Sequence, residues 1–449
     1  MSANRPQQNF GTTCRGPSRR AVLRAGLFGA GGLALGLDEL FRLQTLAAGA
    51  SPAKVKSCIL IWQAGGPSHI DTFDPKPDAT PDVRGEFKPI DTAVPGVKIS
   101  EVFPKLAKVM DRVTLIRSVT SPEADHDRAA HHLLTGYRPT PALVYPGYGS
   151  VVAKIRESSQ AALPAHVAVP DAPIYSSSGY LSAAYDPFTV LNDPNSPTFR
   201  VRDLTPPDKL TLDRLRRRRD MVKSLDGFSK DVSPTPLTAS RDQFSDQAYQ
   251  LLTSTAAQAA FNLGNEPDEL REKYGRTTIG QACLLARRLV ESGVSFVTLN
   301  DKGPGPLGWD THQQNFPMIK NTLAPPLDQG LAALLVDLEE RGLLDTTLVI
   351  MMGEFGRTPK INPNAGRDHH GRANCAILAG AGMPRGAVIG RTDAKADAPV
   401  DRPVTPADLA ATLYTALGID PEFKFESPDG RPIRLVEGGK PLKELVVSS

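Results

Sequence analysis

The sequence predicts an α/β fold with a largely parallel central sheet and helices on both faces of that sheet. Short and continuously apolar stretches such as residues 54–66 are typical of strands buried on both sides. From residue 280 onward, such stretches alternate with segments of helical period. This alternation favours parallel pairing, because two parallel neighbours need a crossover connection that a helix supplies.

The elements follow from apolar runs, periodicity and start signals. Strands are expected at residues 54–66, 113–119, 295–300, 346–353, 374–380 and 387–390, and helices at residues 102–113, 212–225, 245–263, 280–293, 327–344 and 404–419. The last helix has the clearest start, with Thr405 as N-cap, Pro406 at the first helical position and Asp408 in the first turn. Residues 139–209 alternate turns with short apolar pieces and receive no assignment.

The first fifty residues have the features of a targeting segment. Arg19 and Arg20 precede an apolar run at residues 25–37, which is too short to cross the roughly 30 Å hydrocarbon core of a bilayer as a helix. A small-residue site, AGA at residues 48–50, follows. The pattern resembles a twin-arginine export signal. It predicts an exported protein, periplasmic or extracellular, without an integral membrane segment after cleavage. Residues 51–449 are then expected to form a single domain with a helical insertion around residues 205–275.

The charge balance argues against nucleic-acid binding. The whole chain has 52 Lys and Arg against 49 Asp and Glu, but residues 1–50 hold six Arg, no Lys and two acids. The remainder therefore has 46 basic and 47 acidic residues, a net charge of −1, which gives no reason to expect a nucleic-acid partner. The basic run at residues 216–219 is interpreted as a solvated helix face.

Three cysteines remain outside the targeting segment, and each lies in an apolar context. Cys58, Cys283 and Cys375 are predicted to be buried free thiols rather than disulfide partners. Their spacing does not suggest a thiolate zinc site.

Histidine placement is the most informative feature. Seven of the eight His lie in four short motifs, each of which also contains Asp: residues 65–74, 125–136, 309–316 and 366–372. In open α/β sheets, ligands bind at the carboxyl ends of strands, where loops distant in sequence converge. Imidazole and carboxylate together suit zinc or manganese, and carboxylates with water suit calcium. The four motifs therefore favour one shared site for a divalent metal or an anion.

The stretch GEFGRTPKINPNAGRDHHGR at residues 353–372 fits such a site. Glu354 comes directly after an expected central strand, and Gly353 and Gly356 are expected to allow tight turns beside it. Arg357 has a planar fork that suits an anionic substrate group, or it pairs with Glu354. Asp368 and His369 return the chain to the same edge just before the strand at residues 374–380.

These motifs resemble a known family. GGPSHIDTFDPKP, WDTHQ, GEFGRTPKIN and GRDHH, in this order, are similar to the family known only as domain of unknown function 1501. HHLLTGYRP, TTLVIMMGEFG and VTPADLAATLYTALGID also resemble segments of the alkaline phosphatase and sulfatase superfamily. The resemblance covers most of residues 55–420. It implies an alkaline-phosphatase-like fold.

The superfamily resemblance also implies functional residues. Asp310 and His312 resemble its Asp and His metal pair at a shorter spacing, and Glu354 takes the place of a late Asp ligand. His369 is similar in order to the final metal-binding His, and Asp71 is the nearest substitute for the early Asp; with Asp368 they complete the expected metal set. Counting back from LLTG, the nucleophile position falls at His126, which is expected to be a nucleophile, a general acid/base or a ligand. Ser68 and Thr135 are spare hydroxyls without positional support.

Two functions remain open from the sequence. The first is an exported, metal-dependent hydrolase of phosphate or sulfate esters, with zinc, manganese or calcium as cofactor and a small anionic substrate. In it, Arg357 orients the anionic group. The second is a non-catalytic binding or assembly protein on a degenerate sulfatase-like scaffold, since fold resemblance does not establish activity.

Overall fold

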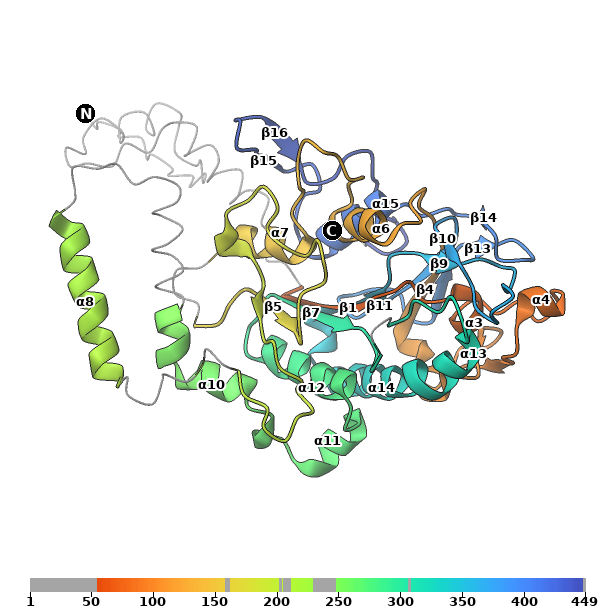
Figure 1. Ribbon diagram of the computed structural model, residues 1–449, viewed down its shortest axis with the longest axis horizontal. Coiled ribbons are helices and arrows are strands. Elements are labelled where there is room, and N and C mark those ends of the chain that lie inside the picture. The colour runs from red at the N-terminus through yellow and green to blue at the C-terminus, as the bar shows by residue number, and fades with distance from the viewer. Residues whose placement is uncertain are drawn as a thin grey trace, which may run out of the picture. The chain divides into compact units, whose positions relative to one another are not determined.

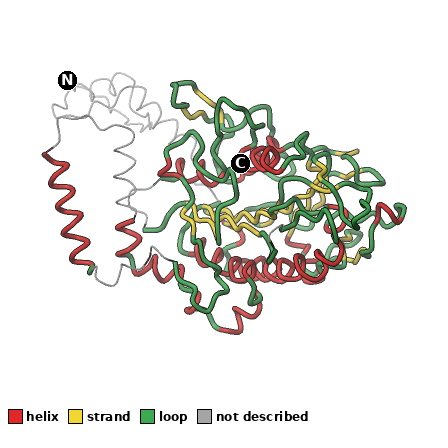
Figure 2. The backbone as a smooth tube through the Cα atoms, in the orientation of Figure 1, coloured by secondary structure: helices red, strands yellow, loops and turns green. Residues whose placement is uncertain are grey.

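The centre of the fold is an eight-stranded sheet in the order β12-β4-β11-β8-β1-β7-β5-β6 (Figures 1 and 2). The computed structural model describes residues 55–157, 162–201, 204, 211–228, 248–305 and 308–446. The strands of the sheet are β1 (Ser57–Gln63), β4 (Val113–Val119), β5 (His166–Val169), β6 (Phe188–Thr189), β7 (Phe296–Asp301), β8 (Thr347–Met352), β11 (Asn374–Ala379) and β12 (Ala387–Ile389).

The predicted parallel sheet is confirmed, with one reversed strand. β1 pairs in parallel with both β7 and β8, β5 pairs in parallel with β6 and β7, and β12 pairs in parallel with β4. β11 runs antiparallel to both β4 and β8, so the sheet is mixed. The six expected strands are all present, and the unassigned region contributes β5 and β6.

Helices cover both faces of the sheet. The longer helices that pack on the sheet are α6 (His126–Thr135), α7 (Tyr148–Ile155), α12 (Thr278–Glu291), α14 (Ala324–Glu340) and α15 (Pro406–Ala416). A further long helix, α8 (Leu212–Phe228), contributes no described side chain to either core. The shorter ones are α3 (His69–Thr72), α4 (Pro81–Arg84), α5 (Pro104–Ala107), α10 (Thr255–Phe261), α11 (Asp268–Tyr274) and α13 (Asn315–Met318). A π-helical turn, Ile319–Leu323, joins α13 to α14.

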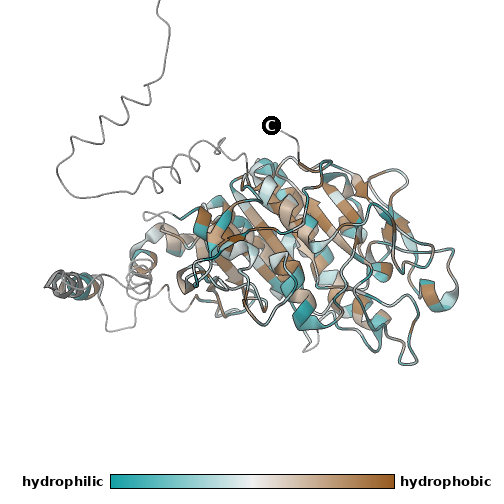
Figure 3. Ribbon diagram, turned by 90° about the horizontal axis from the view of Figure 1, so that it is seen from above, coloured by the Kyte–Doolittle hydropathy of each residue, from teal (hydrophilic) through white to brown (hydrophobic). Residues whose placement is uncertain are grey.

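Alternating side chains of each strand enter two separate cores. In β1, Ile59 and Ile61 pack with α12 and α14, whereas Cys58 and Leu60 pack with α6, α7 and α15 on the other face (Figure 1). This is the period of two expected for a strand buried on both sides. Figure 3, which looks down on the sheet, shows its strands as predominantly hydrophobic.

The described residues also form four small two-stranded sheets outside the central sheet. They pair β2 (Pro89–Asp91) with β3 (Lys98–Ser100), β9 (Gly356–Arg357) with β10 (His369–His370), β13 (Arg391–Thr392) with β14 (Pro399–Asp401), and β15 (Lys424–Glu426) with β16 (Pro432–Arg434). The β9–β10 ladder matters most for the site, because it places His369 opposite Arg357.

The start of α15 and the state of the cysteines agree with the sequence predictions, and the segment at residues 102–113 differs from them. The start of α15 is confirmed, because Thr405 and Asp408 form a capping box and Pro406 opens the helix. Cys58, Cys283 and Cys375 are buried and free, as expected. The single helix expected at residues 102–113 is wrong, because Pro104–Ala107 and a 3₁₀ turn at Met110–Arg112 are separate pieces.

The remaining predictions on organisation stay predictions. The targeting segment at residues 1–50 lies outside the described residues. α8, α10 and α11 fall in the region expected as a helical insertion, of which only a part is described. Within the described part of the chain, no helix is long and apolar enough to cross a membrane.

Gly65, which follows β1, allows the chain to turn beside the loop that carries Asp310, and Gly342, which follows α14, provides a comparison. Gly65 has φ +109°, and an added Cβ would lie 2.8 Å from the carbonyl carbon of Trp309 and against the backbone of Asp310. Gly342 has φ +66°, but no described atom lies within 4 Å of its added Cβ. The two sites thus share the left-handed conformation and differ in the space around it.

We expect Gly65→Ala to destabilise the protein much more than Gly342→Ala. Left-handed backbone costs an alanine about 1–2 kcal/mol at either site, and overpacking adds about 1–3 kcal/mol at Gly65 only. Chemical denaturation of the two variants beside the wild type measures the difference in free energy of unfolding. Equal losses in the two variants would contradict the close approach of Gly65 to the Asp310 loop.

Candidate metal centre

Four loops meet at the edge of the sheet where its parallel strands end. His126 follows β4, Asp310 follows β7, and Glu354 follows β8. Because β11 is antiparallel, the segment with His369 enters the sheet at this same edge. Three of the four His-containing motifs therefore converge at this edge, as expected: those at residues 125–136, 309–316 and 366–372.

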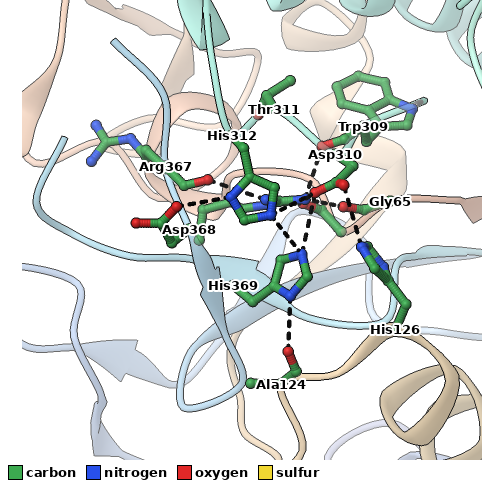
Figure 4. A network of polar contacts seen from close by, with 12 residues as sticks. Gly65, Ala124, His126, Trp309, Asp310, Thr311, His312, Arg367, Asp368 and His369 are labelled. Carbon is green, nitrogen blue, oxygen red and sulfur yellow. Dashed lines mark hydrogen bonds and ion pairs between the residues drawn. The ribbon is translucent and has the colours of Figure 1, made fainter. Parts of the chain in front are cut away.

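His126, Asp310 and His369 form the core of the site. Each offers one ligand atom, and these atoms all lie within 4.8 Å of one another. The Oδ1 atom of Asp310 is 3.2 Å from His369 Nε2, and its Oδ2 atom is 3.4 Å from His126 Nε2 (Figure 4). The two imidazoles thus address different oxygens of one carboxylate.

His312 lies directly beside this core. Its Nε2 atom is 3.3 Å from Asp310 Oδ1 and 2.9 Å from His369 Nε2 (Figure 4). Two imidazole nitrogens at this distance must share a proton or face a common cation, because two lone pairs repel one another. The site therefore brings three imidazoles to one carboxylate.

The second ring nitrogen of each imidazole has its own partner. His126 Nδ1 lies 2.8 Å from Glu354 Oε1, His312 Nδ1 lies 2.8 Å from Asp368 Oδ1, and His369 Nδ1 lies 3.0 Å from the carbonyl oxygen of Ala124. An acceptor at Nδ1 keeps the proton on that nitrogen and leaves the Nε2 lone pair facing the centre. This is the arrangement that orients histidine ligands around a metal ion.

Local structure explains how His126 is placed. The Asp125 side chain caps α6 by accepting the N–H of Arg128, so His126 is the first residue of the helix. The adjacent Asp and His at a helix start were visible in the sequence, but no helix was predicted there. The role of Ala124 was not predictable, because a backbone carbonyl has no sequence signal.

Glu354 holds His126 from outside the core. Its Oε1 atom accepts the N–H of Gly65 at 2.8 Å as well as the Nδ1–H of His126. The chain bends at Glu354 between β8 and β9, but neither Gly353 nor Gly356 has a positive φ. These two glycines allow close packing instead: an added Cβ would meet Pro67 at Gly353 and the His69 ring at Gly356.

The expectation that Arg357 faces an anionic substrate disagrees with its position. Its guanidinium is fully buried and donates to the carbonyl oxygens of Gly65 and Gly66 and, at 2.5 Å, to Asp310 Oδ1. Burial lowers the pKa of Arg357, and the hydrogen bond to Asp310 opposes this shift. Arg357 therefore positions Asp310, and it pairs with that residue rather than with Glu354.

The expectation that Asp71 binds the metal also disagrees with the structure. Arg367 donates to both of its oxygens, at 2.7 and 3.0 Å, and both side chains are fully buried. Ser68 and Asn315 also donate to Asp71 Oδ2, at 2.6 and 2.9 Å. This carboxylate is already satisfied by a structural network, so it does not belong to the cluster.

The other four histidines of the sequence motifs form hydrogen bonds with groups outside the cluster. His69, His131 and His370 each hydrogen-bond to a backbone carbonyl, and His132 bonds to Ser121. Burial lowers the pKa of His69 to about 4, which keeps it neutral. Only His126, His312 and His369 therefore serve the site.

The charges of the cluster are strongly coupled. Burial opposes the ionisation of Asp310, but hydrogen bonds from His126, His369 and Arg357 hold its pKa far below its usual range. The hydrogen bonds to Asp310 and Glu354 raise the pKa of His126 to about 9. A proton on His126 therefore occupies the position in which a cation would balance the two carboxylates.

The donor set fits a divalent transition metal. Imidazole nitrogens with one carboxylate suit zinc or manganese, whereas calcium prefers a shell of oxygens. His126, Asp310 and His369 would hold the ion, with His312 adjacent, while Glu354 and Asp368 orient imidazoles. Of the three metals considered from the sequence, this geometry favours zinc or manganese.

The fold and the site together define an α/β protein with a histidine-rich candidate metal centre at the carboxyl edge of its sheet. The chain belongs to the family described as Protein of unknown function (DUF1501), whose model matches residues 55–446. No curated protein matches the sequence.

Solved structures give distant likenesses. A protein in the alkaline phosphatase superfamily from Vibrio parahaemolyticus is 11% identical over 86% of this chain and 76% of its own, with a TM-score of 0.38. The PsFucS1 sulfatase from a Pseudoalteromonas species is 12% identical over 85% and 70%, with a TM-score of 0.36. A phosphonate monoester hydrolase of Agrobacterium radiobacter is 14% identical over 86% and 78%, with a TM-score of 0.32.

We expect the purified protein to bind a divalent metal that Asp310→Ala and His369→Ala each remove. His370→Ala is the matched control, because His370 is the next residue but hydrogen-bonds to the carbonyl of Asp397 instead. Elemental analysis after metal loading and gel filtration measures the stoichiometry, with circular dichroism to confirm folding. Equal metal content in all folded variants would contradict the assigned ligands.

We expect the affinity for zinc to rise with pH up to about 9, the pKa of His126. An ion must displace the His126 proton, so affinity should rise about tenfold per pH unit below that pKa. The free energy of unfolding of the metal-free protein should change with pH in the opposite direction. Protonated His126 stabilises the fold fully below its unfolded pKa of about 6.5, and this stabilisation is lost as the pH rises through its folded pKa of about 9. Competition titrations with a chelator between pH 6 and 9 test this, and a flat profile would contradict it.

Proposed function

We propose that this protein is a metal-dependent hydrolase of phosphate or sulfate esters. The observation that carries the proposal is the convergence of three imidazoles on Asp310, each with its Nδ1 held by a separate acceptor. A protein that only needed structural histidines would satisfy them as it does His69 and His131, by backbone carbonyls within the fold. A divalent ion would supply Lewis acidity toward an oxygen of the phosphoryl or sulfuryl group.

The chain's own residues would bind and orient. His126, Asp310 and His369 hold the ion, and Arg357 fixes Asp310 from the buried side. Glu354 and Asp368 fix the rings of His126 and His312. Because these supports lie on buried or paired segments, the geometry is set before a substrate arrives, which is what electrostatic catalysis requires.

Water is the nucleophile that this arrangement favours. The position at which a nucleophile was expected holds His126, whose two ring nitrogens face Glu354 and Asp310. The two spare hydroxyls are engaged elsewhere: Ser68 donates to Asp71, and Thr135 donates to the carbonyl of His131. In the proposed step, a water oxygen attacks phosphorus or sulfur, the bond to the ester oxygen breaks, and a proton from water ends on the released alcohol.

We expect the metal-loaded protein to hydrolyse 4-nitrophenyl phosphate or 4-nitrophenyl sulfate. Asp310→Ala should lower kcat/KM by about 100-fold or more. Loss of a residue that only hydrogen-bonds to a metal ligand typically costs about 10–100-fold, and loss of the ligand itself should cost at least as much. His370→Ala should retain activity. With an ester that is chiral at phosphorus, direct attack by water should invert the configuration.

Two results would count against this proposal. Retention of configuration would reveal a covalent intermediate and a nucleophile among the side chains. Bound metal without turnover of either ester would favour the alternative, a binding or assembly protein on the same scaffold.

We also propose that the protein is exported by the twin-arginine pathway. Arg19 and Arg20 before the apolar run at residues 25–37 support this. We expect residues 1–50 to carry a fused reporter to the periplasm, and the double variant Arg19→Lys, Arg20→Lys to keep it in the cytoplasm. Cell fractionation measures the distribution, and export of the double variant would contradict the pathway.

A further inference from the structure

Two hollows adjoin on the side of the metal centre that faces β5 and β7. The first has a volume of about 460 Å³ and reaches the metal centre, because His126 and Glu354 line it. The second has a volume of about 560 Å³ and lies between the start of α12, at Thr278, and the π-helical turn with Asn321 and Thr322. Both volumes are large enough for an organic group rather than a few waters.

The two hollows share part of their walls. Asn300 and Lys302, at the carboxyl end of β7, line both of them. The segment from Pro170 to Ile174 also spans both, with Pro170 in the second hollow and Pro173 and Ile174 in the first. The hollow that reaches the metal centre and the hollow beside α12 are therefore neighbours with a common wall at Asn300 and Lys302.

Asn300 leaves a hydrogen-bond acceptor unused at this junction. Its Nδ2 atom donates to Asp171 Oδ1 at 2.6 Å, and this carboxylate fixes which way the amide points, since an amide oxygen could not face it. The remaining Oδ1 atom is buried without a partner. Buried polar atoms are normally paired, so this unpaired acceptor, on a residue that lines both hollows, has the capacity for one further donor.

The second hollow is lined by hydroxyls and amides. Asn321 and Thr322 offer both donors and acceptors. Thr278 already donates to Asp193, and Gln329 Nε2 donates to the carbonyls of Glu272 and Lys273, so these two side chains offer an acceptor oxygen. Prolines 325 and 326 add apolar surface. Charged side chains on its wall already have partners within the chain: Lys302 pairs with Asp171 at 2.6 Å, and Asp301 accepts hydrogen bonds from Trp309 Nε1 and from the N–H of Gly303. Such a lining matches an uncharged ligand that donates and accepts hydrogen bonds.

The backbone of the far wall gives a second and independent indication. Ile319–Leu323 forms a π-helical turn between α13 and α14, and it carries Asn321 and Thr322. Single π-helical turns are rare and occur frequently at functional sites, where they redirect side chains. Asn321 is exposed and Thr322 is half-buried, so a ligand can reach both.

We propose that the second hollow is a subsite for a polyhydroxylated, uncharged group such as a sugar residue, which belongs to the ester whose phosphate or sulfate lies at the metal centre. Asn300 is the specificity-determining residue at the junction, and its Oδ1 atom accepts a hydrogen bond from a hydroxyl of that group. This assignment of the substrate rests on the proposed hydrolase function. The binding of the sugar itself does not need the metal.

The test is binding of the labelled, metal-loaded protein to an array of neutral, sulfated and phosphorylated di- to hexasaccharides, followed by calorimetric titration of the bound glycan. Thr322→Trp fills the second hollow, and Asn321→Ala removes one of its hydrogen-bonding groups without adding bulk. Lys320→Trp is the matched control, because Lys320 is exposed on the same turn but does not line the hollow. Thermal melts verify that each variant is folded.

We expect wild type and Lys320→Trp to bind the same glycans, and Thr322→Trp or Asn321→Ala to bind them at least about tenfold more weakly. No bound glycan, or equal affinity in all variants, would overturn the subsite. Asp310→Ala separates the two proposals. Glycan binding by this variant with no ester turnover by the wild type would refute the hydrolase and keep the subsite, whereas turnover without glycan binding would do the reverse.

Discussion

The carboxylate of Asp310 is the group on which the site depends. Its Oδ1 atom accepts a hydrogen bond from the fully buried guanidinium of Arg357 and also meets the Nε2 atoms of His312 and His369. Its Oδ2 atom faces the Nε2 atom of His126. A carboxylate with one buried cation can stay ionised in a half-buried position. Since Arg357 also holds the backbone carbonyls of Gly65 and Gly66, the turn after β1 and the loop after β7 are fixed by the same side chain.

The sheet explains why these groups meet at all. β1, β4, β7 and β8 point the same way, so the segments that follow them emerge at one edge. The single reversed strand, β11, brings the β9–β10 ladder and His369 back to that edge. Without this reversal, His369 would lie at the opposite end of the sheet from Asp310, and the imidazoles would not converge.

Much of this architecture could be predicted from the sequence. Apolar runs identify six of the eight strands of the central sheet. Five of them are buried on both faces and so have few polar positions to obscure them, and the sixth is the short edge strand β12. Clustering of His and Asp after those strands predicts Asp310, His312 and His369 as neighbours. The direction of β11 and the strands β5 and β6 could not be predicted, because pairing partners far apart in sequence decide them.

The individual roles were harder to predict than the location. Asp71 and Arg357 have the residue types of a functional site, but burial and a complete set of partners make both structural. For His126 the sequence left three roles open, and the geometry places it with Asp310 and His369 as a candidate ligand. Residue type and spacing cannot separate these cases, because the difference lies in which atoms remain unpaired after folding.

X-ray absorption spectroscopy of the zinc-loaded protein tests whether His126, Asp310 and His369 hold the ion, because it reports the atoms bound to the metal. We expect at least two imidazole nitrogens and carboxylate oxygen at about 2.0–2.1 Å, with imidazole scattering reduced in His369→Ala and unchanged in His370→Ala. A shell of oxygen atoms alone, or a spectrum that His369→Ala leaves unchanged, would contradict this assignment.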